Sequence, residues 1–277
     1  MTAATLAEVL EPALSDGYAL AGLVVLGWED AVAFVEAAEE ARCPVILQAG
    51  PGCRAHTPVP VIGKMMRHLA DQASVPVVCH LDHGYTVDEC RAGIDHGFTS
   101  VMFDGSKLPI SENVDLTAGL VREAHAASVS VEGEVGYVGY AQGAASAFTD
   151  PAEAARFDRE SGADAIAVSV GNVHLQTDKS DGIDFDAVKA IEEVTTKPLV
   201  LHGGSGIPPE IRKRLAHETR VCKFNLGTEL RQTFGRTLRQ TLAEQPEMFD
   251  RLAILKSTMP AMRESVSDIL KTITLKG

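Results

Sequence analysis

Short apolar runs alternate along the chain with longer segments that mix apolar and polar residues. Eight runs rich in valine, isoleucine and leucine fit buried strands, and they cover residues 20–26, 45–48, 75–79, 100–103, 129–134, 165–170, 199–202 and 221–224. Between them lie segments such as 31–42 and 151–164, whose apolar residues recur at roughly the 3.6-residue spacing of a helix. The pattern therefore predicts strands that alternate with helices.

Alternating strands and helices favour a parallel sheet, because parallel neighbours need a long connection. Eight such units in 277 residues predict a (β/α)8 TIM barrel, a fold that typically takes about 250 residues. An open doubly wound sheet is the alternative, but its glycine-rich dinucleotide turn is missing from residues 23–30. No Pro/Gly/Ser-rich linker divides the chain, so we expect residues 1–277 to form a single TIM-barrel domain with a C-terminal helical tail.

The net charge and the composition limit the kinds of molecule that the protein can bind and the compartment that it fits. Lys and Arg number 25 against 38 Asp and Glu, a net charge of −13, which argues against binding to nucleic acid or to an anionic membrane. No stretch reaches the ~20 apolar residues of a membrane span, and the acidic first residues do not resemble a secretory signal. Five cysteines without a C-x-x-C pair argue against a disulfide framework. We therefore expect a reduced, cytoplasmic protein.

Three histidines follow three different predicted strands. In a barrel, the carboxyl ends of the strands meet at one mouth, which would bring together His83, His174 and His202. Three histidines that leave one coordination position open are typical of catalytic zinc. The alternative is that each histidine is only hydrogen-bonded at its strand end. His80 lies within an apolar run, where we expect a packed core histidine or a residue supporting the site.

Carboxylates occupy neighbouring strand ends. Asp82 directly precedes a candidate zinc ligand, where it could exchange a proton with a substrate hydroxyl, although it could equally orient His83. Asp104 and Glu134 could hold a second cation or orient the ligands. Lys223 lies on the last predicted strand, and we interpret it as a structural or surface lysine.

Two glycine-rich segments after the last two strands fit a phosphate. Glycines let backbone N–H groups approach an anion, and a helix predicted after Ser205 would add its partial positive charge. Barrels commonly bind phosphate after strands seven and eight. The candidate phosphate-binding residues are Gly203, Gly204, Ser205, Asn225, Leu226, Gly227 and Thr228.

Five motifs resemble those of the class II, metal-dependent fructose-bisphosphate and tagatose-bisphosphate aldolases. The motifs are HLDHG at 80–84, FDGS at 103–106, VEGEVG at 131–136, LVLHGGSG at 199–206 and KFNLGTEL at 223–230. The similarity extends from about residue 17 to residue 262. It implies a homo-oligomeric TIM barrel, a homodimer or homotetramer, that acts on a small phosphorylated sugar.

The resemblance also implies roles for individual residues. Zn²⁺ would be held by His83, His174 and His202, and Asp82 would be the acid/base at the carbon-4 oxygen of the substrate. Asp104 and Glu134 match positions linked to a second or alternative metal site. Another divalent cation in place of zinc, and a bound monovalent cation, are further options that the resemblance leaves open. The segments 203–205 and 225–228 would hold the phosphate of dihydroxyacetone phosphate.

The sequence departs from the family pattern at positions where the family usually has residues that contact the substrate or transfer its protons. An asparagine usual on the first strand is Val24 here, and a small hydroxylated residue after the second strand is Gly50. The glycine that usually follows the second zinc histidine is Leu175, and a catalytic loop glutamate is replaced by Gln142. A glutamine cannot exchange the carbon-3 proton, so Glu132 or a water molecule held by the metal would take over that task.

These features predict a lyase that cleaves a phosphorylated ketose-type substrate by retro-aldol chemistry. The products would be dihydroxyacetone phosphate, or a related fragment, and an aldehyde. The departures argue that the substrate is not fructose 1,6-bisphosphate. Two alternatives stay open: another metal-dependent sugar-phosphate enzyme, such as an epimerase or hydrolase, and a catalytically silent aldolase-like binding protein.

Overall fold

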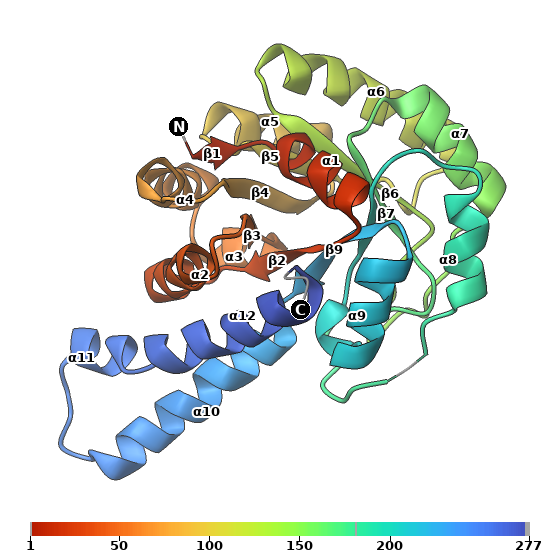
Figure 1. The fold of residues 1–277 in the computed structure, drawn as a ribbon. Coiled ribbons are helices and arrows are strands. Elements are labelled where there is room, and N and C mark those ends of the chain that lie inside the picture. The colour runs from red at the N-terminus through yellow and green to blue at the C-terminus, as the bar shows by residue number, and fades with distance from the viewer. Residues whose placement is uncertain (1, 181, 275–277) are drawn as a thin grey trace.

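The computed structural model describes residues 2–180 and 182–274, and its eight longer strands close into a barrel with helices outside (Figure 1). All the pairings between the named strands are parallel, and the pairing of β4 with β5 closes the ring. Closure confirms the TIM barrel and excludes the open doubly wound sheet. The barrel strands are β2 Leu20–Val24, β3 Val45–Ala49, β4 Val77–Gly84, β5 Ser100–Phe103, β6 Ser130–Val135, β7 Ala165–Val168, β8 Leu199–Leu201 and β9 Val221–Leu226.

The helices that connect the strands form the outer ring, and an apolar core lies between the two layers. They are α2 Trp28–Ala41, α3 Pro51–His56, α4 Val59–Gln72, α5 Val87–Asp95, α6 Ile110–Ala126, α7 Pro151–Ser161, α8 Phe185–Glu192 and α9 Pro209–Glu218. The chain continues into α10 Thr228–Glu244, α11 Arg251–Lys256 and α12 Met259–Ile273. Helix α12 packs against α2, whereas α10 and α11 project away from the barrel as a hairpin (Figure 1).

The N-terminal end of the barrel is plugged by an element that the sequence pattern did not predict. A short strand, β1 Ala3–Ala4, pairs with β4, and α1 Leu6–Asp16 follows it. Thr5 and Glu8 cap this helix reciprocally. Leu6, Val9 and Leu10 pack onto inward-facing apolar residues of the strands. The plug leaves the opposite end of the barrel for the site.

Two further features concern the cysteines and the lengths of the helices. All five cysteines are buried and unbonded. Among the described helices, none combines the length and the apolar character needed to cross a membrane. The single-domain organisation remains a prediction.

Candidate active site

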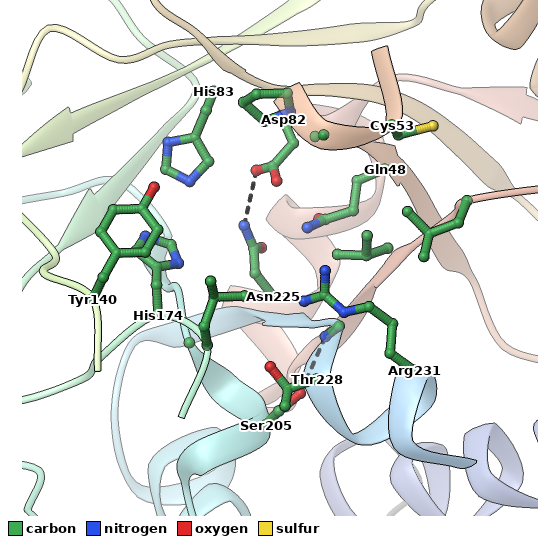
Figure 2. A pocket seen from close by; sticks show the side chains of 18 of the residues that line it. Gln48, Cys53, Asp82, His83, Tyr140, His174, Ser205, Asn225, Thr228 and Arg231 are labelled. Atoms are coloured by element: carbon green, nitrogen blue, oxygen red, sulfur yellow. Dashed lines mark hydrogen bonds between the residues drawn. The ribbon is translucent and has the colours of Figure 1, made fainter. Parts of the chain in front are cut away.

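A cavity of about 290 Å³ opens at the carboxyl ends of the strands (Figure 2). The predicted site residues that line it are Asp82, His83, His174, Gly203, Ser205, Asn225, Gly227 and Thr228. His202, Asp104, Glu134, Gly204 and Leu226 are not among the lining residues, although each lies close to one that is. The barrel therefore gathers segments that are more than a hundred residues apart in the sequence.

The three predicted zinc histidines converge on one point. One ring nitrogen from each of His83, His174 and His202 lies within 4.8 Å of the others. Nε2 of His83 is 2.9 Å from Nδ1 of His202. Three imidazole nitrogens that share a centre at the edge of a cavity make a donor set that fits Zn²⁺.

Carboxylates hold the other nitrogens of two of these rings. Nδ1 of His83 lies 2.8 Å from Oδ2 of Asp104, and Nε2 of His202 lies 3.0 Å from Oε1 of Glu132. Such contacts fix the tautomer and the direction of a ligating ring. Burial lowers the pKa of His174 to about 4 and that of His202 well below its usual value. Both rings are therefore held neutral, as metal ligation requires.

The charge of the third ring is set by its neighbours. Burial disfavours the charged form of His83, but the charge of Asp82, the hydrogen bond that His83 donates to Asp104 and the charge of Glu134 outweigh it and raise the pKa of His83 to about 9. Burial and the nearby Asp104 raise the pKa of Glu134 to about 8. His83, Asp104 and Glu134 form a second cluster with the spacing of a cation site. A second or alternative metal there remains a prediction.

Asp82 and His83 are consecutive in β4, yet both side chains face the cavity. Successive side chains of a regular strand point to opposite faces. Here the register of β4 against β5 shifts between Leu81 and Gly84, and His83 has a left-handed φ of 52°. A non-glycine residue in this conformation costs on the order of 1–3 kcal/mol. The strained backbone allows a carboxylate and an imidazole to share one site.

Neighbouring residues fix the position of Asp82 and keep one of its carboxylate oxygens accessible. Its Oδ1 accepts a hydrogen bond from Nδ2 of Asn225 at 3.0 Å. Arg54 donates to the backbone carbonyl oxygens of Asp82, at 2.5 Å, and of His83, at 2.9 Å. A Cβ atom at Gly50 would stand 3.3 Å from Oδ2 of Asp82, so the glycine keeps this oxygen open. Sequence reasoning missed Arg54, because nothing near residue 54 indicates a contact with β4.

Two sequence interpretations are resolved at the base of the site. Lys223 is the structural rather than the surface lysine of the two alternatives: it is fully buried, with Nζ 2.8 Å from Oε2 of Glu132. Glu132 does not line the cavity, and Lys223 and His202 occupy its two oxygens. It is therefore placed to orient His202 rather than to exchange a substrate proton. His80 is fully buried, as expected, with Nδ1 2.9 Å from Oγ of Ser100.

The phosphate-binding candidates form two linked segments. The Ser205 hydroxyl oxygen accepts hydrogen bonds from the backbone N–H groups of Gly227 at 3.1 Å and of Glu229 at 3.3 Å. The helix predicted after Ser205 is α9, which begins at Pro209 after a 3-10 turn at residues 204–206, but no residue of α9 lines the cavity. The helix whose positive end meets the cavity is α10, which begins at Thr228.

The loop after β6 contributes a different residue from the one expected. Gln142 is exposed and does not line the cavity. Tyr140 does, and its ring stacks on that of His174 with centroids 4.9 Å apart. Backbone hydrogen bonds from Ala141 to His174 and from His174 to Gly139 fasten the loop. Two side chains on the opposite wall, Gln48 and Arg231, were also missed (Figure 2).

Comparison with known proteins gives the family. The family of class II fructose-bisphosphate aldolases matches residues 4–277. The 6-phospho-5-dehydro-2-deoxy-D-gluconate aldolase of Shouchella clausii is 37% identical over 272 residues, which cover 96% of this chain and 92% of the relative. The fructose-bisphosphate aldolase of Geobacillus stearothermophilus is 35% identical over 275 residues, 96% of this chain and 95% of that one.

A solved structure agrees with these relatives. The YdjI aldolase of Escherichia coli K12 is 31% identical, with a TM-score of 0.86 over 99% of this chain and 98% of that chain. The matches cover the whole barrel and every motif that carried the sequence resemblance. The chain therefore belongs to the class II fructose-bisphosphate aldolase family and is a lyase.

Proposed function

We propose that this lyase cleaves a phosphorylated ketose-type substrate between carbons 3 and 4, releasing dihydroxyacetone phosphate or a related fragment and an aldehyde. The observation that carries the proposal is the shared cavity of Asp82, the histidine cluster and the two glycine-rich segments. A base, a candidate cation site and a candidate anion site around one cavity are the groups that a retro-aldol cleavage of a phosphorylated ketose needs.

Asp82 would act at the carbon-4 hydroxyl. Its carboxylate accepts the hydroxyl proton while the bond between carbons 3 and 4 breaks, carbon 4 becomes the aldehyde, and the electron pair moves toward the carbon-2 carbonyl. Asn225 holds the carboxylate in place by donating to Oδ1. Zn²⁺, held by His83, His174 and His202, would supply Lewis-acid stabilisation of the developing negative charge.

The phosphate would lie against residues 203–205 and 225–228. The support is the start of α10 at Thr228, because a helix N-terminus attracts an anion. The left-handed φ of Gly203 brings the chain close to the backbone of Val173 and turns it into the cavity. This arrangement supports binding of a phosphate in a protein whose net charge is −13.

We further propose that fructose 1,6-bisphosphate is not the substrate. Val24 and Gly50 line the cavity at the positions where the family usually has an asparagine and a small hydroxylated residue. Gln142, which replaces the loop glutamate, does not line the cavity. The two curated relatives are named for different substrates, one of them a phosphorylated deoxygluconate. This supports a phosphorylated keto-sugar or keto-acid.

The test is release of triose phosphate from a panel of substrates by the purified, zinc-loaded protein. The panel contains fructose 1,6-bisphosphate, tagatose 1,6-bisphosphate, ketose 1-monophosphates and 6-phospho-5-dehydro-2-deoxy-D-gluconate. We expect cleavage of at least one ketose phosphate, with fructose 1,6-bisphosphate a poor substrate. Asp82→Asn should bind zinc normally and lose at least a hundredfold in kcat. Absence of triose phosphate with every compound, or an undiminished rate in Asp82→Asn, would refute the proposal.

We propose a cytoplasmic location and a homodimer or homotetramer. The five unbonded thiols support a reducing compartment. Sedimentation of the zinc-loaded protein tests the assembly, and a monomer at micromolar concentration would contradict it.

A further inference from the structure

Tyr140 lies beside the candidate metal ligands and has no role in the proposed cleavage so far. It lines the cavity, and its ring stacks on the imidazole of His174, with the two ring centroids 4.9 Å apart and the ring planes 28° apart. Figure 2 shows its hydroxyl oxygen on the side of His83. The phenol oxygen therefore lies at the edge of the histidine cluster, in the cavity that Asp82 also lines.

The backbone holds Tyr140 in this place from both sides. Its own N–H donates to the carbonyl oxygen of Ala144 at 3.1 Å. The N–H of Ala141 donates to the carbonyl oxygen of His174 at 3.0 Å, and the N–H of His174 donates to the carbonyl oxygen of Gly139 at 2.8 Å. These hydrogen bonds set the position of the hydroxyl before a substrate binds, which is the property of a preorganised donor.

A second tyrosine adjoins this hydroxyl. Tyr85 lines the same cavity, and its hydroxyl donates a hydrogen bond to the hydroxyl oxygen of Tyr140. Within residues 2–180 and 182–274, no protein group accepts the proton of the Tyr140 hydroxyl. Burial raises the pKa of both phenols, so both keep their protons near neutral pH. The Tyr140 hydroxyl therefore has one proton available for a ligand in the cavity.

Negative charge would develop close to this hydroxyl during the proposed cleavage. As the bond between carbons 3 and 4 breaks, the electron pair moves toward the carbon-2 oxygen. The histidine cluster is the candidate site of the cation that would stabilise this charge, and Tyr140 lies against one of its rings. A neutral donor binds an oxygen more strongly once the oxygen is charged, so such a donor stabilises the transition state more than the substrate.

We propose that the Tyr140 hydroxyl donates a hydrogen bond to the carbon-2 oxygen of the substrate as negative charge develops there, and that the Tyr85 hydroxyl orients it. The inference rests on the proposed function and adds two residues to the same site. Tyr140 keeps its proton throughout the cleavage. It is then a catalytic residue, whereas Tyr85 is a positioning residue that acts through Tyr140.

Phenylalanine variants test the two hydroxyls, because each variant keeps its aromatic ring. With the substrate that the zinc-loaded protein cleaves fastest, Tyr140→Phe should lower kcat about 100-fold, the lower end of the cost of losing one oxyanion donor. Its zinc affinity, measured by competition with a zinc-binding dye, should not change. Tyr85→Phe should lower kcat less. The double variant Tyr85→Phe/Tyr140→Phe should be no slower than Tyr140→Phe, because Tyr85 acts only through that hydroxyl.

Binding of an enediolate mimic gives a readout that does not depend on turnover. Phosphoglycolohydroxamate carries a phosphate and planar oxygens like those of the enediolate, whereas sn-glycerol 3-phosphate carries a phosphate without them. In calorimetry, Tyr140→Phe should weaken binding of the hydroxamate about tenfold, as expected for loss of a hydrogen bond to a charged group. It should leave binding of sn-glycerol 3-phosphate unchanged.

The control is Tyr137→Phe, in the same loop, whose ring lies under Lys107 and does not line the cavity. It should match the unmutated protein in every assay. An unchanged kcat or an unchanged affinity for the hydroxamate in Tyr140→Phe would overturn the inference. A loss of zinc affinity in step with kcat would also overturn it, because the hydroxyl would then support His174 rather than contact the substrate. If the unmutated protein cleaves no ketose phosphate, the proposed function fails first and the inference falls with it.

Discussion

Nε2 of His202 lies 3.0 Å from Oε1 of Glu132, and both side chains are fully buried. The other Glu132 oxygen is paired with Lys223. Glu132→Gln should leave Lys223 as an uncompensated buried charge, which costs about 3–5 kcal/mol of the free energy of unfolding. The change should also weaken zinc binding about 10- to 100-fold, because His202 loses its orienting carboxylate. Urea unfolding and competition with a zinc-binding dye measure the two effects.

The double variant Glu132→Gln/Lys223→Met separates these two roles. It removes the unpaired charge, so it should recover much of the stability without recovering the zinc affinity. If Glu132→Gln binds zinc as the unmutated protein does, Glu132 does not orient His202.

Leu175 adopts a left-handed φ of 56°, and its side chain is 53% exposed. Leu175→Ala keeps the strained Cβ, whereas Leu175→Gly removes it. Glycine relieves the strain of the left-handed conformation, but its unfolded chain is more flexible, which offsets part of the gain. The net free energy of unfolding of the glycine variant should exceed that of the alanine variant by about 0.5–1 kcal/mol. Urea unfolding of the two variants measures the difference. A more stable alanine variant would mean that this backbone relaxes freely.

Gly203 also has a left-handed φ, of 66°, and a Cβ atom there would collide with the carbonyl oxygen of Val173. Gly203→Ala should lower the free energy of unfolding by about 1–3 kcal/mol. It should also weaken zinc binding, because Val173 precedes His174. The control is Gly52→Ala, which lines the same cavity but would have no heavy atom within 4 Å of its new Cβ. Equal behaviour of the two variants would contradict this account.

Burial raises the pKa of the Cys79, Cys90 and Cys222 thiols to about 12. In the unfolded chain a thiol has a pKa near 9, so between about pH 9 and pH 12 the folded state binds more protons than the unfolded state. The free energy of unfolding therefore falls as the pH rises above 9. Removing one such thiol should reduce the slope of the free energy of unfolding against pH by about 1.4 kcal/mol per pH unit. Urea unfolding of Cys79→Ala between pH 8 and 10.5 tests this. An unchanged slope would show that the Cys79 thiol ionises as easily when folded.

The sequence by itself determined the eight strands, the barrel and the positions of the metal and base candidates. These follow from local patterns: apolar runs, helical spacing, and polar residues where each strand ends. Because strand ends meet at one mouth in a closed barrel, His83, His174 and His202 were placed together before any distance was known. The N-terminal plug was missed, because burial of α1 depends on strands distant in sequence.

Tertiary structure alone decided which polar residues face the cavity. Glu132 lies in the middle of β6 and Asp82 near the carboxyl end of β4, and barrel closure buries Glu132 against Lys223, which is 91 residues away. Tyr140 rather than Gln142 reaches the cavity, because backbone hydrogen bonds fasten the loop to His174. Gln48 and Arg231 meet the same cavity from β3 and α10. Such contacts depend on side-chain direction and on closure of the ring, and neither leaves a local pattern in the sequence.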